Sequence, residues 1–135
     1  MSDTKNMLNI GLKHTETFTV SNDLTAKTIQ SGGLDVLATP ALIAMMEKCA
    51  WQSVLSALED GLDTVGTEIT MTHLAPSPIG AKVTCTSELI LINERELIFH
   101  IDAYDKTKKI GEATHKRFII KISSFQNKAY SKSTK

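Results

Sequence analysis

The chain is poor in the residues that mark several specialised classes of protein. Its 135 residues include two cysteines, three prolines and one tryptophan. Fifteen basic side chains balance fifteen acidic ones, so the positive excess that is typical of nucleic-acid-binding domains is missing. No apolar run approaches the roughly 18 residues of a membrane span, and the start shows no pattern of a secretory signal. We therefore expect no nucleic-acid partner and no membrane partner.

The two cysteines, Cys49 and Cys85, are far apart and belong to no CxxC or CxxH grouping. Both are therefore expected to be reduced, buried residues of a cytoplasmic protein. A chain of this length can bury one core without disulfides or metals. Because no repeat or low-complexity linker is present, we expect a single domain over residues 1–135. Its core should span about 12–125, with short polar tails and a lysine-rich, solvated C-terminal end.

One long helix and about five strands are predicted. Thr39 suits the N-cap of the helix, Pro40 its first position and Gly61 its end, which gives about twenty residues. Alternating or apolar runs predict strands over residues 14–20, 64–75, 81–92, 96–104 and 110–122. The turns between the later strands are short, as in antiparallel meanders. The pattern predicts an α+β fold in which an antiparallel sheet wraps around one central helix.

Glu47 lies in the middle of the apolar face of this helix. At about 100° per residue, Ile43, Trp51 and Val54 fall within about 60° of it, whereas Lys48 belongs to the polar stripe. Burying an unpaired carboxylate costs several kcal/mol, so Glu47 needs a partner or a cavity. One interpretation is a structural glutamate bonded to a backbone group or to an arginine of the sheet. The other is a carboxylate that faces a cleft and acts as base, nucleophile or orienting group.

A histidine occurs on the apolar side of the segment "GTEITMTHLAP". By strand alternation, His73 shares a face with Val65, Ile69 and Met71. A lone histidine on such a face is more often a packed core residue than a functional one. Its interpretation changes if the carboxylate of Glu47 lies in the same core. The other histidines show no metal-ligand spacing, so no metal site is expected.

Thr39 can be explained by helix capping alone, but it also allows a second interpretation. It lies about 80° from Glu47 on the helix and about 12 Å away by helical rise. The two side chains cannot bond to each other along the helix, but they can line one groove. The free amides at the helix start would also favour a developing oxyanion there.

Three segments carry a resemblance to a known family: "ATPALIAMMEKCA", "VGTEITMTHLAPSPIGAKVTCTSEL" and "GEATHKRFII". Over about residues 12–129 the chain resembles the fluoroacetyl-CoA thioesterase family of hotdog-fold proteins. The resemblance implies that Thr39, Glu47 and His73 are catalytic and that Gly66 and Arg117 bind substrate. It implies a homodimer or higher oligomer that hydrolyses an acyl-CoA thioester, with no cofactor besides the coenzyme A of the substrate.

The resemblance also implies a role for each residue. Glu47 would act as nucleophile or as base toward water, while His73 would move the proton to the leaving thiol. Thr39 would orient water or the acyl carbonyl, or attack it. Gly66 and Arg117 would hold the acyl end or the thioester oxygen. The alternation places Gly66 and His73 on opposite faces, so either a bulge separates them or they serve different faces or subunits.

Two alternatives concern what is done with the ligand. One is a hotdog module that binds an acyl-CoA or another small ligand without hydrolysing it. The other is a hydratase or dehydratase of acyl thioesters, which is disfavoured because residues 40–58 contain no histidine. The family's lid carries phenylalanines, whereas the corresponding connection here reads "LTAKTIQSGGLDVL". The sequence therefore does not indicate fluoroacetyl-CoA as the substrate.

Overall fold

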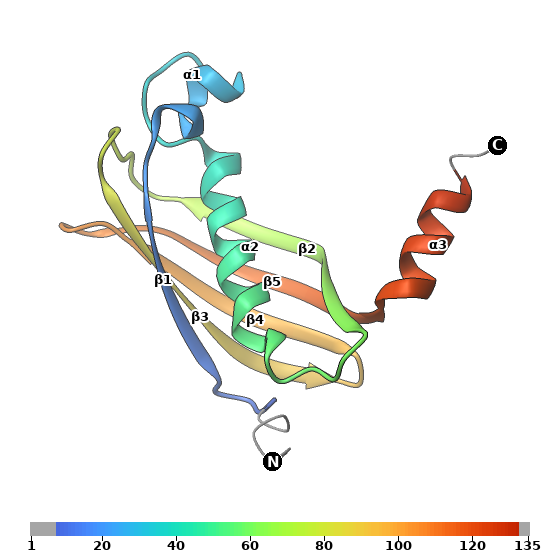
Figure 1. Ribbon diagram of the computed structural model, residues 1–135. Helices are drawn as coiled ribbons and strands as arrows, with labels where there is room; N and C mark the ends of the chain where they lie inside the picture. Colours follow the sequence, from blue (N-terminus) through green and yellow to red (C-terminus); the bar gives the residue numbers. More distant parts are fainter. Residues whose placement is uncertain (1–7, 133–135) are drawn as a thin grey trace.

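The computed structural model describes residues 8–132 and contains one antiparallel sheet (Figure 1). Its strands lie in the order β1-β3-β4-β5-β2, so β1 and β2 form the two edges. The bounds are β1 (Lys13–Thr19), β2 (Leu62–His73), β3 (Lys82–Asn93), β4 (Glu96–Tyr104) and β5 (Lys109–Lys121). All five predicted strands are present, each within two residues of its expected ends. The start of the chain, for which no secretory signal is expected, and Lys135 of the lysine-rich end lie outside the described residues.

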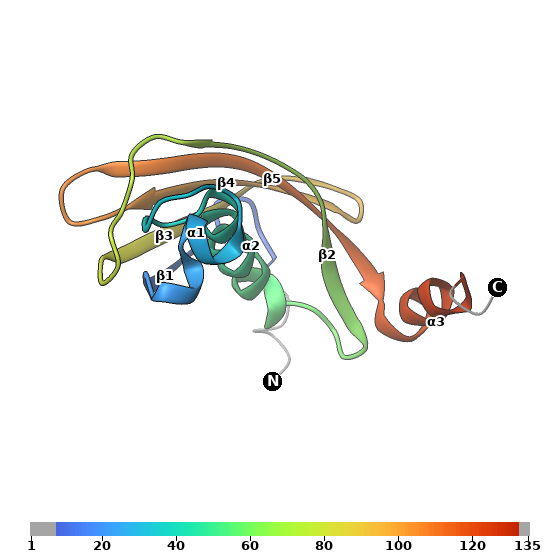
Figure 2. The same ribbon diagram turned by 90° about the horizontal axis from the view of Figure 1, so that it is seen from above.

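The sheet curves around one helix, α2 (Thr39–Leu55), which lies along its concave face (Figure 2). The helix contributes Leu42, Met46 and Cys49 to the core, and the sheet contributes residues such as Phe99 and Leu97, all fully buried. Each such large apolar side chain stabilises the fold by about 1.5–3 kcal/mol. The predicted α+β fold, with a sheet wrapped around a central helix, is confirmed.

The start of α2 differs from the prediction that Thr39 is the N-cap. Ala38 occupies that position, in extended conformation, and makes no side-chain capping bond. Its N–H donates to the carbonyl of Leu24 at 2.9 Å, which holds Ala38 outside the helix. Thr39 therefore becomes the first helical residue, and its hydroxyl is free for another partner. The helix also ends at Leu55 rather than at Gly61, whose φ of 89° belongs to the turn before β2.

A β-bulge interrupts the pairing of β2 with β5. Gly66 pairs with Arg117 and Glu68 pairs with Lys116, so Thr67 is the extra residue. The bulge reverses the alternation of faces within β2. Gly66 consequently points to the same side as His73, and the expectation that Val65 shares that side is wrong.

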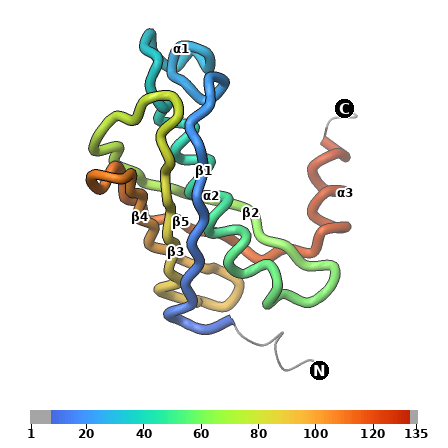
Figure 3. Tube along the Cα trace, turned by 60° about the vertical axis from the view of Figure 1, so that its left-hand side comes forward, coloured from blue at the N-terminus to red at the C-terminus, as the bar shows by residue number. Residues whose placement is uncertain are grey.

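The connection between β1 and α2 is folded rather than an open loop. It contains a 3₁₀ turn over Asn22–Leu24 and the short helix α1 (Ala26–Ile29), which lies at the N-terminal end of α2 (Figure 3). Bridges from Thr25 to Leu37 and from Val36 to Pro78 hold it in place. The backbone of this connection thereby fixes where α2 begins.

Residues Ile122–Lys132 form a helix, α3, in the part of the chain where a lysine-rich, solvated end is expected. All of its residues are exposed, and it stands apart from α2 beyond the edge formed by β2 (Figure 1). This exposure agrees with the expected solvation, whereas the helix itself was not predicted. No helix within residues 8–132 is both long and apolar enough to cross a membrane.

Candidate active site

Thr39 and His73 meet where α2 begins and β2 ends. The Thr39 hydroxyl and Nδ1 of His73 share a hydrogen bond of 2.9 Å. Nε2 of the histidine is buried and has no hydrogen-bond partner among the described residues. Both side chains line a cavity of about 330 Å³, together with the connection and the residues that follow β2. The ring therefore has one nitrogen oriented by Thr39 and one left available.

Burial sets the charge of His73. Desolvation lowers the pKa of its imidazole below the ordinary 6.5, and a smaller effect of the Ala75 backbone opposes the shift. At neutral pH the ring is therefore uncharged and can accept a proton. A neutral histidine that is bonded to a hydroxyl has the protonation state that general-base chemistry requires.

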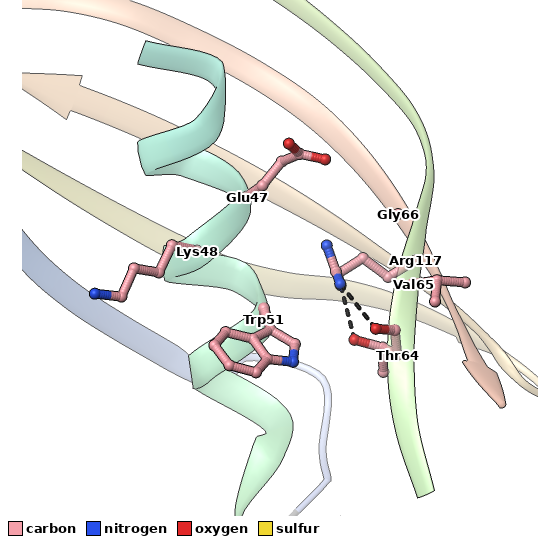
Figure 4. A pocket seen from close by; sticks show the side chains of 7 residues that line it. All are labelled: Glu47, Lys48, Trp51, Thr64, Val65, Gly66 and Arg117. Atoms are coloured by element: carbon pink, nitrogen blue, oxygen red, sulfur yellow. Dashed lines mark hydrogen bonds between the residues drawn. The ribbon is translucent and has the colours of Figure 1, made fainter. Parts of the chain in front are cut away.

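Glu47 faces a second cavity, of about 370 Å³, between α2 and β2 (Figure 4). Gly66, Trp51 and Arg117 are among the residues that line it. The carboxylate is half-buried and forms no hydrogen bond or ion pair within residues 8–132. An ideal Cβ placed on Gly66 would lie 3.0 Å from Oε2 of Glu47, so the carboxylate reaches almost to the backbone of β2. This geometry favours the interpretation of Glu47 as a carboxylate facing a cleft.

Arg117 is held rigidly on the other side of this cavity. Its Nε donates to the Thr64 hydroxyl at 2.7 Å and its Nη2 donates to the Thr64 carbonyl at 2.9 Å. Burial lowers the pKa of the guanidinium, and the charges of Glu47 and Asp63 oppose that shift. Arginine remains cationic in proteins. A fixed positive charge therefore faces the unpaired carboxylate and can hold a thioester oxygen or another electron-rich group.

His115 belongs to this arrangement, although the sequence analysis did not single it out. Its Nδ1 donates to the Glu68 carbonyl at 2.9 Å, which leaves Nε2 to accept from Nη1 of Arg117 at 3.1 Å. The side chain is completely buried. Its position two residues before Arg117 on the same face of a strand was the available signal. His115 positions the arginine and does not itself line the cavity.

Protonation of His115 should destabilise the fold. Burial, first, and then the charge of Arg117 lower its pKa below 6.5, while Glu68 and Glu47 act in the opposite direction. Because the folded pKa lies below the unfolded one, stability is complete above pH 6.5 and is lost as the pH falls from there toward the folded pKa. We expect Tm to fall over this window and to fall less in His115→Asn. A scanning-calorimetry series that shows equal slopes for both proteins would contradict this role.

Gly66 leaves the space that the Glu47 carboxylate occupies. A methyl group there would also lie 3.1 Å from His115 and 3.3 Å from Arg117. Since Glu47 is the flexible neighbour, Gly66→Ala should displace its carboxylate and leave the fold intact. We expect about a tenfold loss of kcat with little change in Tm. Thr67→Ala at the exposed bulge residue is the matched control, and equal activity of the two variants would argue against the contact.

The five predicted site residues thus form two groups within one chain. Thr39 and His73 line one cavity, and Glu47, Gly66 and Arg117 line the other. The two α2 residues are eight positions apart, which corresponds to about 12 Å along the helix. Both cavities are lined in part by β2, which is an edge strand.

The arrangement of sheet and helix is shared with solved structures of hotdog proteins. A hot-dog-like protein from Thermanaerovibrio acidaminovorans superimposes with a TM-score of 0.84, at 17% identity, over 97% of this chain and 96% of that one. At this identity the likeness shows the fold alone. The predicted hotdog fold is thereby confirmed.

Sequence comparison defines the family within that fold. The family model described as FlK, fluoroacetyl-CoA-specific thioesterase, matches residues 20–123. A fluoroacetyl-CoA thioesterase of Streptantibioticus cattleyicolor is 35% identical over 98 residues, which cover 73% of this chain and 70% of the relative. A solved FlK variant in complex with acetyl-CoA has a TM-score of 0.89 at 29% identity, over 93% of this chain and 98% of that one. The protein belongs to this family of thioesterases.

Proposed function

We propose that the protein hydrolyses an acyl-CoA thioester to the free acid and coenzyme A. Thr39, Glu47 and His73 are the catalytic residues in this proposal, and Gly66 and Arg117 bind substrate. A thioester carbonyl is already electrophilic and its thiolate leaves readily. The protein must therefore supply a nucleophile or an activated water, a proton carrier and a donor for the developing oxyanion.

The observation that carries the proposal is the unpaired carboxylate of Glu47 opposite the fixed guanidinium of Arg117. A carboxylate without a hydrogen bond can attack a carbonyl or accept a proton from water, and Arg117 can stabilise negative charge on the thioester oxygen. His73, neutral and with Nε2 available, can carry the proton to the leaving thiolate. Thr39 orients the ring through Nδ1.

A homodimer is part of the proposal. An edge strand presents unpaired backbone groups that favour pairing with a second copy. We propose that two β2 strands pair in antiparallel fashion, which would bring the Gly66 end of one beside the His73 end of the other. The two cavities of a single chain would then be joined across the interface. The proposed dimer would require a molecular mass of twice the 14.8 kDa chain in light scattering.

The acyl group is left open. The connection over residues 24–37 contains no Phe, Tyr or Trp, and among residues 8–132 none lines the cavity that this connection forms with Thr39 and His73. We therefore do not propose that this protein selects a fluorinated acetyl group. We further propose a single cytoplasmic domain, because the reduced state of the buried Cys49 and Cys85 suits that compartment.

A panel of acyl-CoA thioesters tests the activity directly. The wild-type protein and His73→Ala are assayed by trapping the released thiol, over short linear and branched acyl groups. Hydrolysis by the wild type that falls by at least about a hundredfold in the variant is the expected result. His100→Ala, on the exposed face of β4, is the control. Binding of acyl-CoA with no thiol release from any substrate would instead identify a ligand-binding module.

A further inference from the structure

A basic cleft lies at the end of β5, where α3 leaves the sheet. It has a volume of about 390 Å³. Three cations gather there, one from the turn between β3 and β4 and two from β5 and α3. The lining residues are Arg95, Ile120, Lys121, Ser124, Phe125 and Lys128. Among residues 8–132 no carboxylate lines this cavity, and none of the catalytic residues proposed above belongs to it.

The three positive charges of this cleft form no ion pair in the part of the chain that the structure describes. Neither Arg95, Lys121 nor Lys128 forms an ion pair with any residue among 8–132. The helix α3 contains no Asp or Glu, so its positive N-terminal end is not compensated in its first turn. Like charges held together without counter-charges repel one another. An anion in the cleft would relieve that repulsion.

The cleft also offers a surface for an aromatic ring. Phe125 is 41% exposed although it is a large apolar residue, and it lines the cavity together with the three cations. The hydroxyl of Ser124 has only a long contact of 3.5 Å, to the Lys121 carbonyl, and can donate to an anion. Cations, a hydroxyl and an aromatic face together match a phosphorylated nucleotide better than a bare inorganic ion.

We propose that this cleft binds the 3′-phosphoadenosine diphosphate end of coenzyme A. The inference rests on the proposed function, because it assumes that a CoA thioester is the ligand. The phosphates would contact Arg95, Lys121 and Lys128, and the adenine would lie against Phe125. The cleft would thus supply binding energy that is remote from the reacting carbonyl.

The position of the cleft relative to Arg117 suits this ligand. Arg117 and Lys121 lie on the same face of β5, because the register between them is unbroken. Four residues separate them, which corresponds to about 13 Å along the strand. The pantetheine arm between thioester and diphosphate has the backbone length of about four peptide residues, or roughly 14 Å when extended. A thioester held at Arg117 therefore places the diphosphate near Lys121.

The test uses the double variant Lys121→Ala/Lys128→Ala in the full chain. We expect the calorimetric Kd of CoA to rise at least about tenfold, since loss of charge-assisted contacts to phosphate is worth a factor of this size. KM for an acyl-CoA should rise similarly with kcat unchanged, while KM for the S-acyl-pantetheine, which lacks the nucleotide, should not change. The charge-matched control is Lys106→Ala/Lys108→Ala, in the turn before β5, which should bind CoA as the wild type does.

The outcomes separate this inference from the proposed function. If CoA binding depends on the cleft but no thioester is hydrolysed, the inference stands and the hydrolase proposal fails. Equal Kd values for CoA in the cleft variant and in the control would overturn the inference, whatever the activity. Competition by inorganic pyrophosphate as strong as that by 3′,5′-ADP would also overturn it, because it would reveal a general anion site. Circular dichroism of each variant checks that α3, whose residues are all exposed, has not unfolded.

Discussion

Glu47→Gln is expected to lower kcat about a thousandfold without unfolding the protein. Glutamine has the same shape, but it can neither attack a carbonyl nor accept a proton, and positioned acid–base groups contribute about 10²–10⁴-fold to rates. Because Glu47 forms no hydrogen bond or ion pair within residues 8–132, its replacement breaks no structural contact. Tm should therefore stay nearly constant. Thiol release and thermal unfolding measured on the same preparation separate the chemical effect from a structural one.

The matched control for this substitution is Glu59→Gln, at an exposed residue beyond the end of α2. It should leave both kcat and Tm unchanged. Full activity of Glu47→Gln would contradict a catalytic role of Glu47 and would leave it only an electrostatic effect on Arg117. A large fall in Tm would show that the carboxylate stabilises the arginine, and a loss of activity could not then be assigned to chemistry.

The sequence predicts the general layout of this fold because the layout follows from patterns within short segments. Strand alternation and the threonine–proline start of the helix need no knowledge of distant contacts. The role of Thr39 is different. Whether Thr39 or Ala38 caps the helix depends on a hydrogen bond from Ala38 to Leu24, a residue far back in the connection. A local capping rule cannot include that bond, so it assigns the hydroxyl to the helix rather than to His73.

The alternation of β2 shows a second limit. Periodicity of two assigns each residue to a face only while the register is regular, and the bulge at Thr67 shifts that register. From the sequence, either a bulge between Gly66 and His73 or different faces or subunits for the two residues was expected, without a position for the bulge. With the bulge in place, Gly66 lies next to the side chains of Glu47 and Arg117. The bond between His115 and Arg117 was missed because their shared face of β5 indicates that they are neighbours but not that they bond to each other.

A mixed dimer is expected to recover activity from two inactive chains. In the proposed assembly, His73 of one protomer and Glu47 of the other meet at one site. A dimer of His73→Ala with Glu47→Gln then contains one intact site and one site with both defects. Random assortment makes about half of the dimers mixed, so the mixture should regain roughly one quarter of wild-type activity. The parent proteins should each show about a hundredth of it or less.

The physical basis is the distance between the two cavities within one chain. Thr39 and Glu47 are about 12 Å apart along α2, too far for one thioester carbonyl to touch both. Antiparallel pairing of two β2 edges reverses the order of the cavities in the second copy. The partner chain then brings the second group of residues to the first, so no movement of α2 is needed to close the distance between the two cavities. The measurement is thiol release by a mixed dimer isolated through two different affinity tags.

In the reciprocal experiment the mixed dimer is expected to lose activity rather than to regain it. A wild-type chain is paired with the double variant His73→Ala/Glu47→Gln. If each site contains residues of both protomers, each of the two sites carries one defect. The mixed dimer is then inactive. If each chain holds its own complete site, the wild-type half remains active, and the first mixed dimer gains nothing over its parents. The two mixed dimers therefore give opposite results under the two arrangements, so a general loss of activity during subunit exchange cannot imitate either one.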